Sequence, residues 1–99
     1  MLYILICRDK ADVGLERRMT ARPDHLSYLE AAGDKVRIGG AMLTPDEKSP
    51  IGSVIVIEAD SIEEARAFAQ SDPYAKADVF SDVEIHPWRQ AAGVVKTGS

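Results

Sequence analysis

The 99-residue sequence has a single cysteine, Cys7, so it can form neither an internal disulfide nor a thiolate metal site of its own. It has no apolar run near the roughly 20 residues of a membrane-spanning helix, and no signal-peptide pattern at its start. Basic residues are also few, with 12 Lys and Arg against 16 Asp and Glu and a net charge of −4. That balance argues against nucleic-acid binding, which normally requires a basic patch. These absences predict a cytoplasmic protein with neither a membrane nor a nucleic-acid partner.

The motifs of several large enzyme classes are missing as well. The sequence has no glycine-rich phosphate loop, no Gly-x-Ser-x-Gly elbow and no His, Cys and carboxylate cluster at metal-ligand spacing. We therefore expect no metal site and no cofactor. The composition is that of an ordinary globular protein, with 45% apolar and 28% charged residues. The length suits one domain, which we place at residues 1–92, followed by a flexible C-terminal tail at 93–99.

Four stretches are typical of β-strands: residues 2–7, 35–43, 52–58 and 80–88. The first and third contain apolar runs without a polar face, which indicates strands that are covered on both sides. In the second, the pair Gly39 and Gly40 indicates a bulge or a close approach of the backbone to another group.

A helical pattern follows the first strand. We expect Asp12 to cap it and Gly33 to end it. Pro23 lies inside this segment and predicts a break or kink, with Thr20 capping the second piece. Spacings of four and three define a stripe that we expect to be the buried face of the helix: Leu15, Met19, Arg22, Leu26, Leu29 and Gly33.

Two further helix starts are marked by capping residues. Ser61 and Glu64 form a capping box, and the apolar face that follows consists of Ile62, Ala65, Phe68 and Ala69. Asp72 followed by Pro73 is typical of a new cap with proline in the first helical position, and it predicts a short helix to about Asp78.

The resulting order is βαββαβ, which folds most simply as a ferredoxin-like α+β sandwich, an antiparallel sheet with both helices on one face. In that topology the first and third strands are the central pair, and these are the strands without a polar face. The other face of the sheet then lacks a cover. We expect a homodimer that packs through this face, with a monomer exposing an apolar face as the alternative.

Few residues could carry chemistry. His25 lies at the margin of the apolar stripe, where it could transfer a proton near neutral pH or be a packed, hydrogen-bonded side chain. Arg22 interrupts the stripe, which indicates either an anionic partner or a kink that turns it to solvent. Helix capping by itself explains Asp72, and packing explains Tyr74. The backbone at Gly40 could approach a ligand closely.

Several stretches together resemble the YciI-like (YCII-related) family over about residues 1–89. The resemblance is carried mainly by Arg22-Pro23-Asp24-His25-Leu26, by Ser71-Asp72-Pro73-Tyr74 and by Glu84-Ile85-His86-Pro87-Trp88. It implies that residues 1–92 form a YCII-related domain with a ferredoxin-like fold and dimers similar to the dimeric α/β barrels. It also implies that His25 and Asp72 correspond to a His and Asp pair proposed as the family's active site.

Most members of the family have no established reaction, and one relative is a dehydrochlorinase of a chlorinated hydroxyhydroquinone. Our first hypothesis is therefore a small-molecule lyase or isomerase, with His25 as general acid–base, Asp72 orienting it, and Arg22, Tyr74 and Gly40 binding the substrate. The second is a non-catalytic dimeric module that binds a small-molecule ligand or another partner. In the third, His25 and Asp72 are a purely structural pair.

Overall fold

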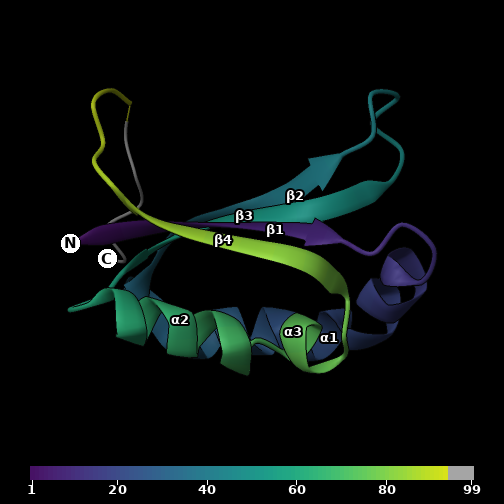
Figure 1. Cartoon of the computed structure of the whole chain (residues 1–99), viewed down its shortest axis with the longest axis horizontal. Helices are drawn as coiled ribbons and strands as arrows, with labels where there is room; N and C mark the ends of the chain where they lie inside the picture. The colour runs from purple at the N-terminus through teal and green to yellow at the C-terminus, as the bar shows by residue number, and fades with distance from the viewer. Residues whose placement is uncertain (94–99) are drawn as a thin grey trace.

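A four-stranded antiparallel sheet and a layer of helices on one of its faces make up the fold (Figure 1). The computed structural model describes residues 1–93. The elements are β1 (Leu2–Asp9), α1 (Gly14–Ala32), a 3-10 turn (Gly33–Lys35), β2 (Val36–Leu43), β3 (Pro50–Glu58), α2 (Ile62–Ser71), α3 (Pro73–Lys76) and β4 (Phe80–Trp88). Except for Gly93, the predicted tail at 93–99 lies outside the described residues.

The order of the strands in the sheet is β2-β3-β1-β4, which confirms the ferredoxin-like topology. The two central strands are β1 and β3, as their lack of a polar face predicted. Leu5 of β1 lies opposite Ile55 of β3 and Ile85 of β4. Because side chains alternate along a strand, Tyr3, Leu5 and Cys7 face the helices, and the residues between them face the opposite side.

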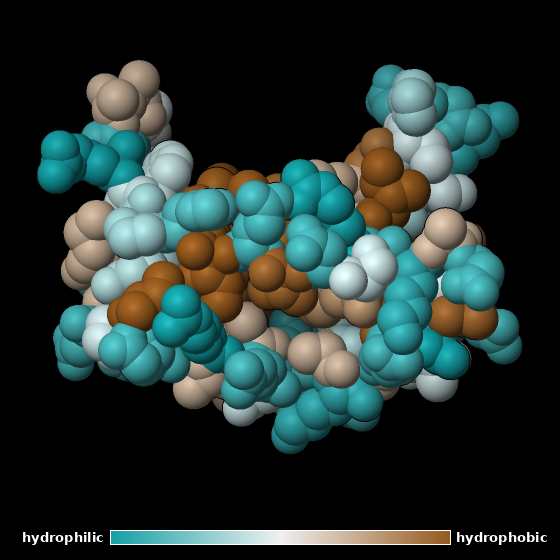
Figure 2. Space-filling model, viewed as in Figure 1, coloured by the Kyte–Doolittle hydropathy of each residue, from teal (hydrophilic) through white to brown (hydrophobic). Residues whose placement is uncertain are grey.

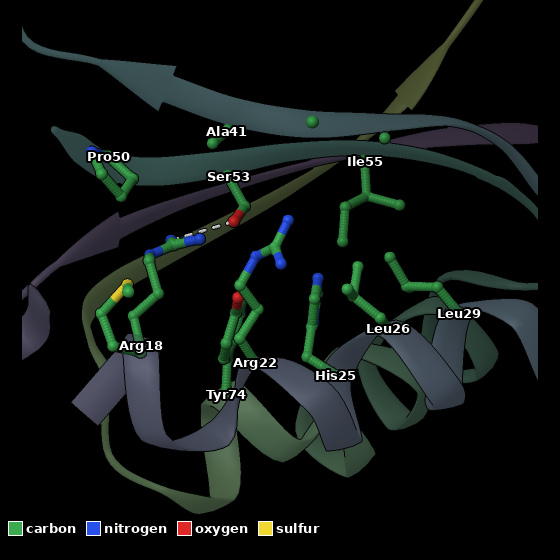
Figure 3. Close-up of a pocket in the computed structure, with 13 residues that line it drawn as sticks. Arg18, Arg22, His25, Leu26, Leu29, Ala41, Pro50, Ser53, Ile55 and Tyr74 are labelled. Atoms are coloured by element: carbon green, nitrogen blue, oxygen red, sulfur yellow. Dashed lines mark hydrogen bonds between the residues drawn. The ribbon is translucent and has the colours of Figure 1, made fainter. Parts of the chain in front are cut away.

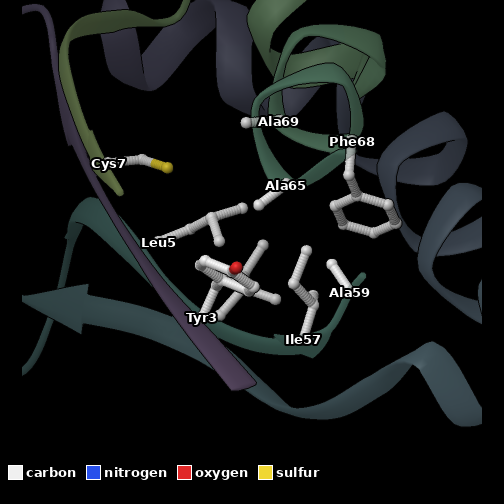
Figure 4. Packing of buried hydrophobic residues seen from close by; sticks show 9 residues of the cluster. Tyr3, Leu5, Cys7, Ile57, Ala59, Ala65, Phe68 and Ala69 are labelled. Carbon is white, nitrogen blue, oxygen red and sulfur yellow. The ribbon is translucent and has the colours of Figure 1, made fainter. Parts of the chain in front are cut away.

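The apolar core lies between the two central strands and α2 (Figure 4). Ile57 and Ala65 are fully buried, and Leu5 is 1% exposed. Ser61 caps α2 as predicted, because its Oγ accepts a hydrogen bond from the Glu64 N–H at 3.1 Å. The return bond of the capping box differs, because the Glu64 carboxylate accepts the backbone N–H of Asp60, at 2.9 Å, in place of that of Ser61. No helix within residues 1–93 is long and apolar enough to cross a membrane.

The start and the middle of α1 correct the sequence prediction. The helix begins at Gly14 with Val13 as its N-cap, and Asp12 does not cap it. A Cβ at Gly14 would lie 2.8 Å from Asp9 Cβ, so the glycine allows α1 to start directly against β1.

Pro23 lies inside α1 without dividing it into two helices. Thr20 caps no second piece, because its hydroxyl donates to the carbonyl of Glu16 within the same helix, at 3.1 Å. An interior proline removes one helical hydrogen bond and costs about 3 kcal/mol. Side-chain contacts before and after Pro23, made by Arg18 and His25, hold the helix against the rest of the molecule. Gly33 ends α1, as predicted.

The face of α1 that is buried also differs from the prediction. Leu15, Met19 and Leu26 of the apolar stripe are 45%, 61% and 45% exposed. In contrast, Arg18 and His25 are 4% and 7% exposed. The helical spacing of the stripe is confirmed, but Arg18 and His25 beside it find partners in the interior. Four residues of the stripe, Met19, Arg22, Leu26 and Leu29, therefore border the cavity described below, and the stripe is not the fully buried face of the helix.

The glycine pair of β2 contains no bulge. The register of β2 on β3 shifts on either side of the pair, between Val36 and Ile38 and between Met42 and Leu43. This corrects the bulge that the sequence indicated, although both glycines border the cavity described below.

Candidate functional site

A cavity of about 300 Å³ lies between α1 and the sheet, on the side of β2 and β3 (Figure 3). Its polar lining consists of Arg18, Arg22, His25, Ser53 and Tyr74. These residues come from α1, β3 and α3, and β2 completes the wall, so the cavity exists only when the folded chain brings four separate segments together. Pockets of this size lie at the lower end of the range for small-molecule sites.

His25 and Asp72 meet at the edge of this cavity, although they are 47 residues apart in the sequence. The Nδ1 atom of His25 lies 2.8 Å from Oδ1 and 3.0 Å from Oδ2 of Asp72, and both side chains are buried. A carboxylate only accepts hydrogen bonds, so Nδ1 carries the proton that it donates to Asp72. In the neutral ring the other nitrogen, Nε2, then has a free lone pair, and Figure 3 shows the ring directed into the cavity.

Asp72 also caps α3. Its Oδ1 accepts the Tyr74 backbone N–H at 2.8 Å, as the sequence predicted for this position. The same carboxylate therefore starts a helix and holds the imidazole of His25. Because the backbone of the cap is fixed, the position of the His25 ring is fixed as well.

Tyr74 is stacked between two side chains of α1. Its ring lies on the His25 ring at a centroid distance of 3.8 Å and an angle of 11°, and Arg18 Cζ lies 4.5 Å from its centroid. Arg18 in turn donates to both oxygens of Asp9, at 2.8 Å and 2.7 Å, and to Ser53 Oγ at 3.0 Å. We call Asp9, Arg18, Tyr74, His25 and Asp72 the polar row.

The surroundings of the polar row determine its charge states. Burial lowers the pKa of Arg18, but the hydrogen bonds and charge of Asp9 outweigh this effect, and the pKa lies above its usual value. Burial raises the pKa of Tyr74, against the opposing effect of Arg18. At neutral pH Arg18 is thus a cation and Tyr74 a neutral phenol that can donate a hydrogen bond but cannot act as a base.

Every site residue suggested by the sequence borders this cavity or contacts a residue that does. Arg22, Tyr74 and Gly40 line it, together with His25, and Asp72 binds His25 from behind. His25 is also a packed, hydrogen-bonded side chain, and Asp72 is also a helix cap, so both alternative interpretations of these residues are confirmed as additional roles.

Sequence reasoning missed Arg18 and Asp9. The available signal was spacing: Arg18 precedes His25 by seven residues, two turns of α1, and therefore lies on the same side of the helix. Within residues 1–93, no three His, Cys, Asp or Glu side chains are grouped to hold a metal ion. Cys7 is buried beneath the sheet, and burial raises the pKa of its thiol to about 12, so it is a poor nucleophile near neutral pH.

Comparisons with known proteins give a consistent result. The sequence model of the YCII-related domain family matches residues 1–89. The protein YciI of Escherichia coli is 37% identical over 97 residues, which cover 91% of this chain and 98% of that protein. An uncharacterized protein of Haemophilus influenzae is 27% identical over the same shares of the two chains.

A solved structure is also similar. It is the 5-chloro-2-hydroxyhydroquinone dehydrochlorinase TftG of Burkholderia phenoliruptrix in complex with 2,5-dihydroxybenzoquinone. It superimposes with a TM-score of 0.83 at 30% identity, covering 92% of this chain and 96% of the other. The whole of the ferredoxin-like unit is thus shared with an enzyme that acts on a small molecule.

Proposed function

Because this chain belongs to the YCII-related family, we propose that it is a YciI-like enzyme that catalyses an elimination or an isomerisation of a small molecule. The observation that carries this proposal is the placement of the His25 ring. Asp72 holds the ring at Nδ1, and the other nitrogen, Nε2, is directed into the cavity. The similarity to a dehydrochlorinase supports the same class of reaction.

In the proposed reaction, His25 Nε2 removes a proton from the substrate. The electron pair of the broken bond then either expels a leaving group such as chloride or moves to a neighbouring carbonyl oxygen. Asp72 stabilises the imidazolium that forms, because it accepts the Nδ1–H. In an isomerisation, the imidazolium returns the proton to a different atom. Such proton transfer contributes a factor of about 10² to 10⁴, enough for an activated small molecule.

We propose that Arg22, Tyr74 and Gly40 bind the substrate. They border the same cavity as His25: Arg22 precedes it by three residues on α1, Tyr74 stacks against its ring, and Gly40 lies on β2. A stacked tyrosine restricts the tilt of the imidazole, which keeps Nε2 directed at the bound molecule.

The test compares variants of the two histidines. His25→Gln removes the proposed base, whereas His86→Gln changes an exposed histidine of β4 and is the matched control. Chloride release is measured with chlorinated hydroxyhydroquinones, and isomerisation with a set of unsaturated lactones. We expect turnover by the wild type and by His86→Gln, with a loss of at least 100-fold in His25→Gln. Equal turnover by His25→Gln would contradict the proposal.

A non-catalytic ligand-binding module is the second candidate. It is favoured by the small number of titratable groups at the cavity, where His25 is the one side chain suited to proton transfer near neutral pH within the described lining. Native mass spectrometry distinguishes the two functions. A ligand that copurifies and stays chemically unchanged during long incubation supports this candidate and contradicts the enzyme.

We also propose that the protein is a homodimer that packs through the open face of the sheet. All helices lie on the other face (Figure 1). The register places Ile4, Val56 and Ile38 in one row across three strands of the open face, with Ile6 and Val54 in the next row. Figure 2 shows the surface hollowed between two projections, the β2–β3 loop and the segment after β4.

Sedimentation velocity tests this assembly. Ile4→Lys inserts a charge into the centre of the open face and should give monomers. Leu15→Lys places the same charge on the exposed side of α1 and should leave the dimer intact. Monomeric wild-type protein at micromolar concentration would contradict the proposal.

A further inference from the structure

The lining of the cavity is positively charged and contains no negative group. α1 supplies Arg18, Arg22 and the titratable His25, and neither Asp nor Glu is among the residues that border the cavity. The chain as a whole has a net charge of −4, so the positive charge of the cavity lining is opposite in sign to the net charge of the protein. Positive groups in a cleft with low-dielectric walls raise the local concentration of anions.

The three positively charged or titratable groups differ in their partners. Asp9 binds the Arg18 guanidinium through two hydrogen bonds, and Asp72 accepts from His25. Arg22 forms no ion pair or hydrogen bond with any residue of 1–93, while it borders the cavity. Its charge is therefore available to a ligand, whereas the charge of Arg18 is already neutralised by a carboxylate.

The position of Arg22 relates that charge to the proposed base. Arg22 and His25 are three residues apart on α1, so their side chains leave the helix on the same side. Figure 3 shows both rising from α1 toward β3 into one space. A molecule whose anionic oxygen binds Arg22 would present its neighbouring atoms to the His25 ring.

The remaining walls favour a flat molecule. Leu26, Leu29 and Ile55 form an apolar side of the cavity. On β2, Gly39 leaves open the space that a side chain would fill, since a Cβ there would lie 3.8 Å from the side chain of Ile55. The cavity between α1 and the sheet is therefore wider at Gly39, where β2 carries no side chain.

We propose that the ligand of this cavity is a small planar organic anion, of about the size of one ring, whose carboxylate, phenolate or enolate oxygen binds Arg22. This inference rests on the proposed function and names the substrate class of the same site. A guanidinium donates two parallel hydrogen bonds to such oxygens. If His25 removes a proton next to a carbonyl group, the electron pair moves to that carbonyl oxygen, and Arg22 is placed to stabilise the resulting charge.

The experiment compares benzoate with benzamide, a neutral molecule of nearly the same shape. Binding is followed through the NMR signals of the His25 ring in the full-length wild type and in three variants. Arg22→Gln removes the charge, and Arg22→Lys keeps it without the paired donors. Arg66→Gln, on the exposed side of α2, removes one positive charge away from the cavity and is the matched control.

We expect wild type and Arg66→Gln to bind benzoate about tenfold more tightly than benzamide, with a preference that decreases as salt is added. Arg22→Gln should bind the two molecules equally, and Arg22→Lys should have an intermediate preference. Equal binding by the wild type, a preference that survives in Arg22→Gln, or no change of the His25 signals with either molecule would each overturn the inference.

A pair of variants on β2 tests the flat shape. Gly39→Val places a side chain toward the cavity and should abolish benzoate binding, while Ile38→Val, at a neighbouring position whose side chain points to the other face of the sheet and does not border the cavity, should preserve it. Benzoate binding that is unchanged in Gly39→Val would overturn the shape requirement.

The failure of this inference can be told apart from the failure of the proposed function. If benzoate and benzamide bind equally well but turnover requires His25, the inference of an anionic ligand is refuted and the proposed function stands. Binding that requires Arg22, combined with turnover that is equal in the wild type and His25→Gln, would refute the proposed base alone.

Discussion

Two buried regions lie beneath the same sheet, and they are built from opposite kinds of side chain. Beside α2, the interior is apolar, with Leu5, Ile57 and Ala65 at its centre (Figure 4). Beside α3 and the stretch of α1 from Arg18 to His25, the interior is the polar row, from Asp9 to Asp72, in which each charged group has a partner. The cavity lies between the two regions, with the polar row on one side and Ile55 of the apolar core on the other.

The two regions therefore have different main roles: the apolar core stabilises the fold, and the polar row shapes the candidate site. Burial of apolar side chains stabilises the folded state in proportion to the buried area, and it does not require a specific partner for each side chain. A buried ion pair contributes little net stability, because desolvation of the two charges offsets their attraction, but removing one partner is costly. The apolar core should therefore tolerate substitutions that conserve volume, whereas the polar row should tolerate only changes made in pairs.

The largest effect is expected where the polar row loses one charge. Asp9→Ala leaves the buried Arg18 without its carboxylate and should cost about 3–5 kcal/mol of unfolding free energy. The double variant Asp9→Leu with Arg18→Met removes both charges and should recover much of this loss. Urea denaturation measures both. A double variant that is no more stable than Asp9→Ala would refute the contrast between the two regions.

In the apolar core, Leu5→Ala should cost about 3 kcal/mol, because it leaves a cavity at a residue that is 1% exposed. Leu5→Met conserves volume and should cost less than about 1.5 kcal/mol. The same urea titrations provide the comparison. If the two variants were equally destabilised, the core would depend on specific shape as strongly as the polar row depends on partners.

A smaller effect is expected from Asp72, which has two roles in the polar row. Asp72→Ala should cost about 2 kcal/mol, since it removes the cap of α3 and the acceptor of His25. Asp72→Asn should cost about half as much, because asparagine also caps helices well. Thermal unfolding measures the stability, and the His25 NMR signals report whether the ring moves. Equal losses in both variants would show that capping contributes little here.

The smallest effect concerns the response of the apolar core to high pH. Burial raises the pKa of Cys7 from 9.0 to about 12, so the folded state holds this proton more tightly than the unfolded state. Its contribution to stability is therefore complete well below pH 9 and decreases above it, by an amount on the order of 1 kcal/mol at pH 10.

Cys7→Ala should remove this part of the pH dependence, which is visible when urea unfolding is compared at pH 7 and pH 10. Burial also raises the pKa of Tyr74, so the polar row should lose stability in the same direction at still higher pH. Tyr74→Phe separates the two contributions. A Cys7→Ala variant with the same loss at pH 10 as the wild type would contradict the prediction for the thiol.

Much of the fold could be read from local patterns. The apolar runs of β1 and β3, the Ser61 cap of α2 and the Asp72-Pro73 helix start are all present in the structure. Each depends on interactions within a few residues or on burial of a whole strand, and such signals survive in the sequence. The pair of His25 and Asp72 was located through its motifs, because both lie in segments typical of the family.

The orientation of α1 could not be read in the same way. Its apolar stripe predicted which residues share a side of the helix, but not which side faces inward. That depends on Asp9 of β1 and Ser53 of β3, which bind Arg18. Turning Arg18 to solvent would leave the buried Asp9 carboxylate without its partner, and this cost exceeds the gain from burying Leu15 or Met19. The continuity of α1 through Pro23 has the same origin, because contacts on both sides of the proline outweigh its cost.

By itself, then, the amino-acid order determined the type and succession of the strands and helices, since backbone propensities, caps and alternation act over short distances. Tertiary structure alone decided that Arg18 and Asp9 join Tyr74, His25 and Asp72, and that a cavity opens beside them. These features arise from residues of five separate segments, β1, α1, β2, β3 and the start of α3. The energy of a buried charge depends on which partner the folded chain places against it.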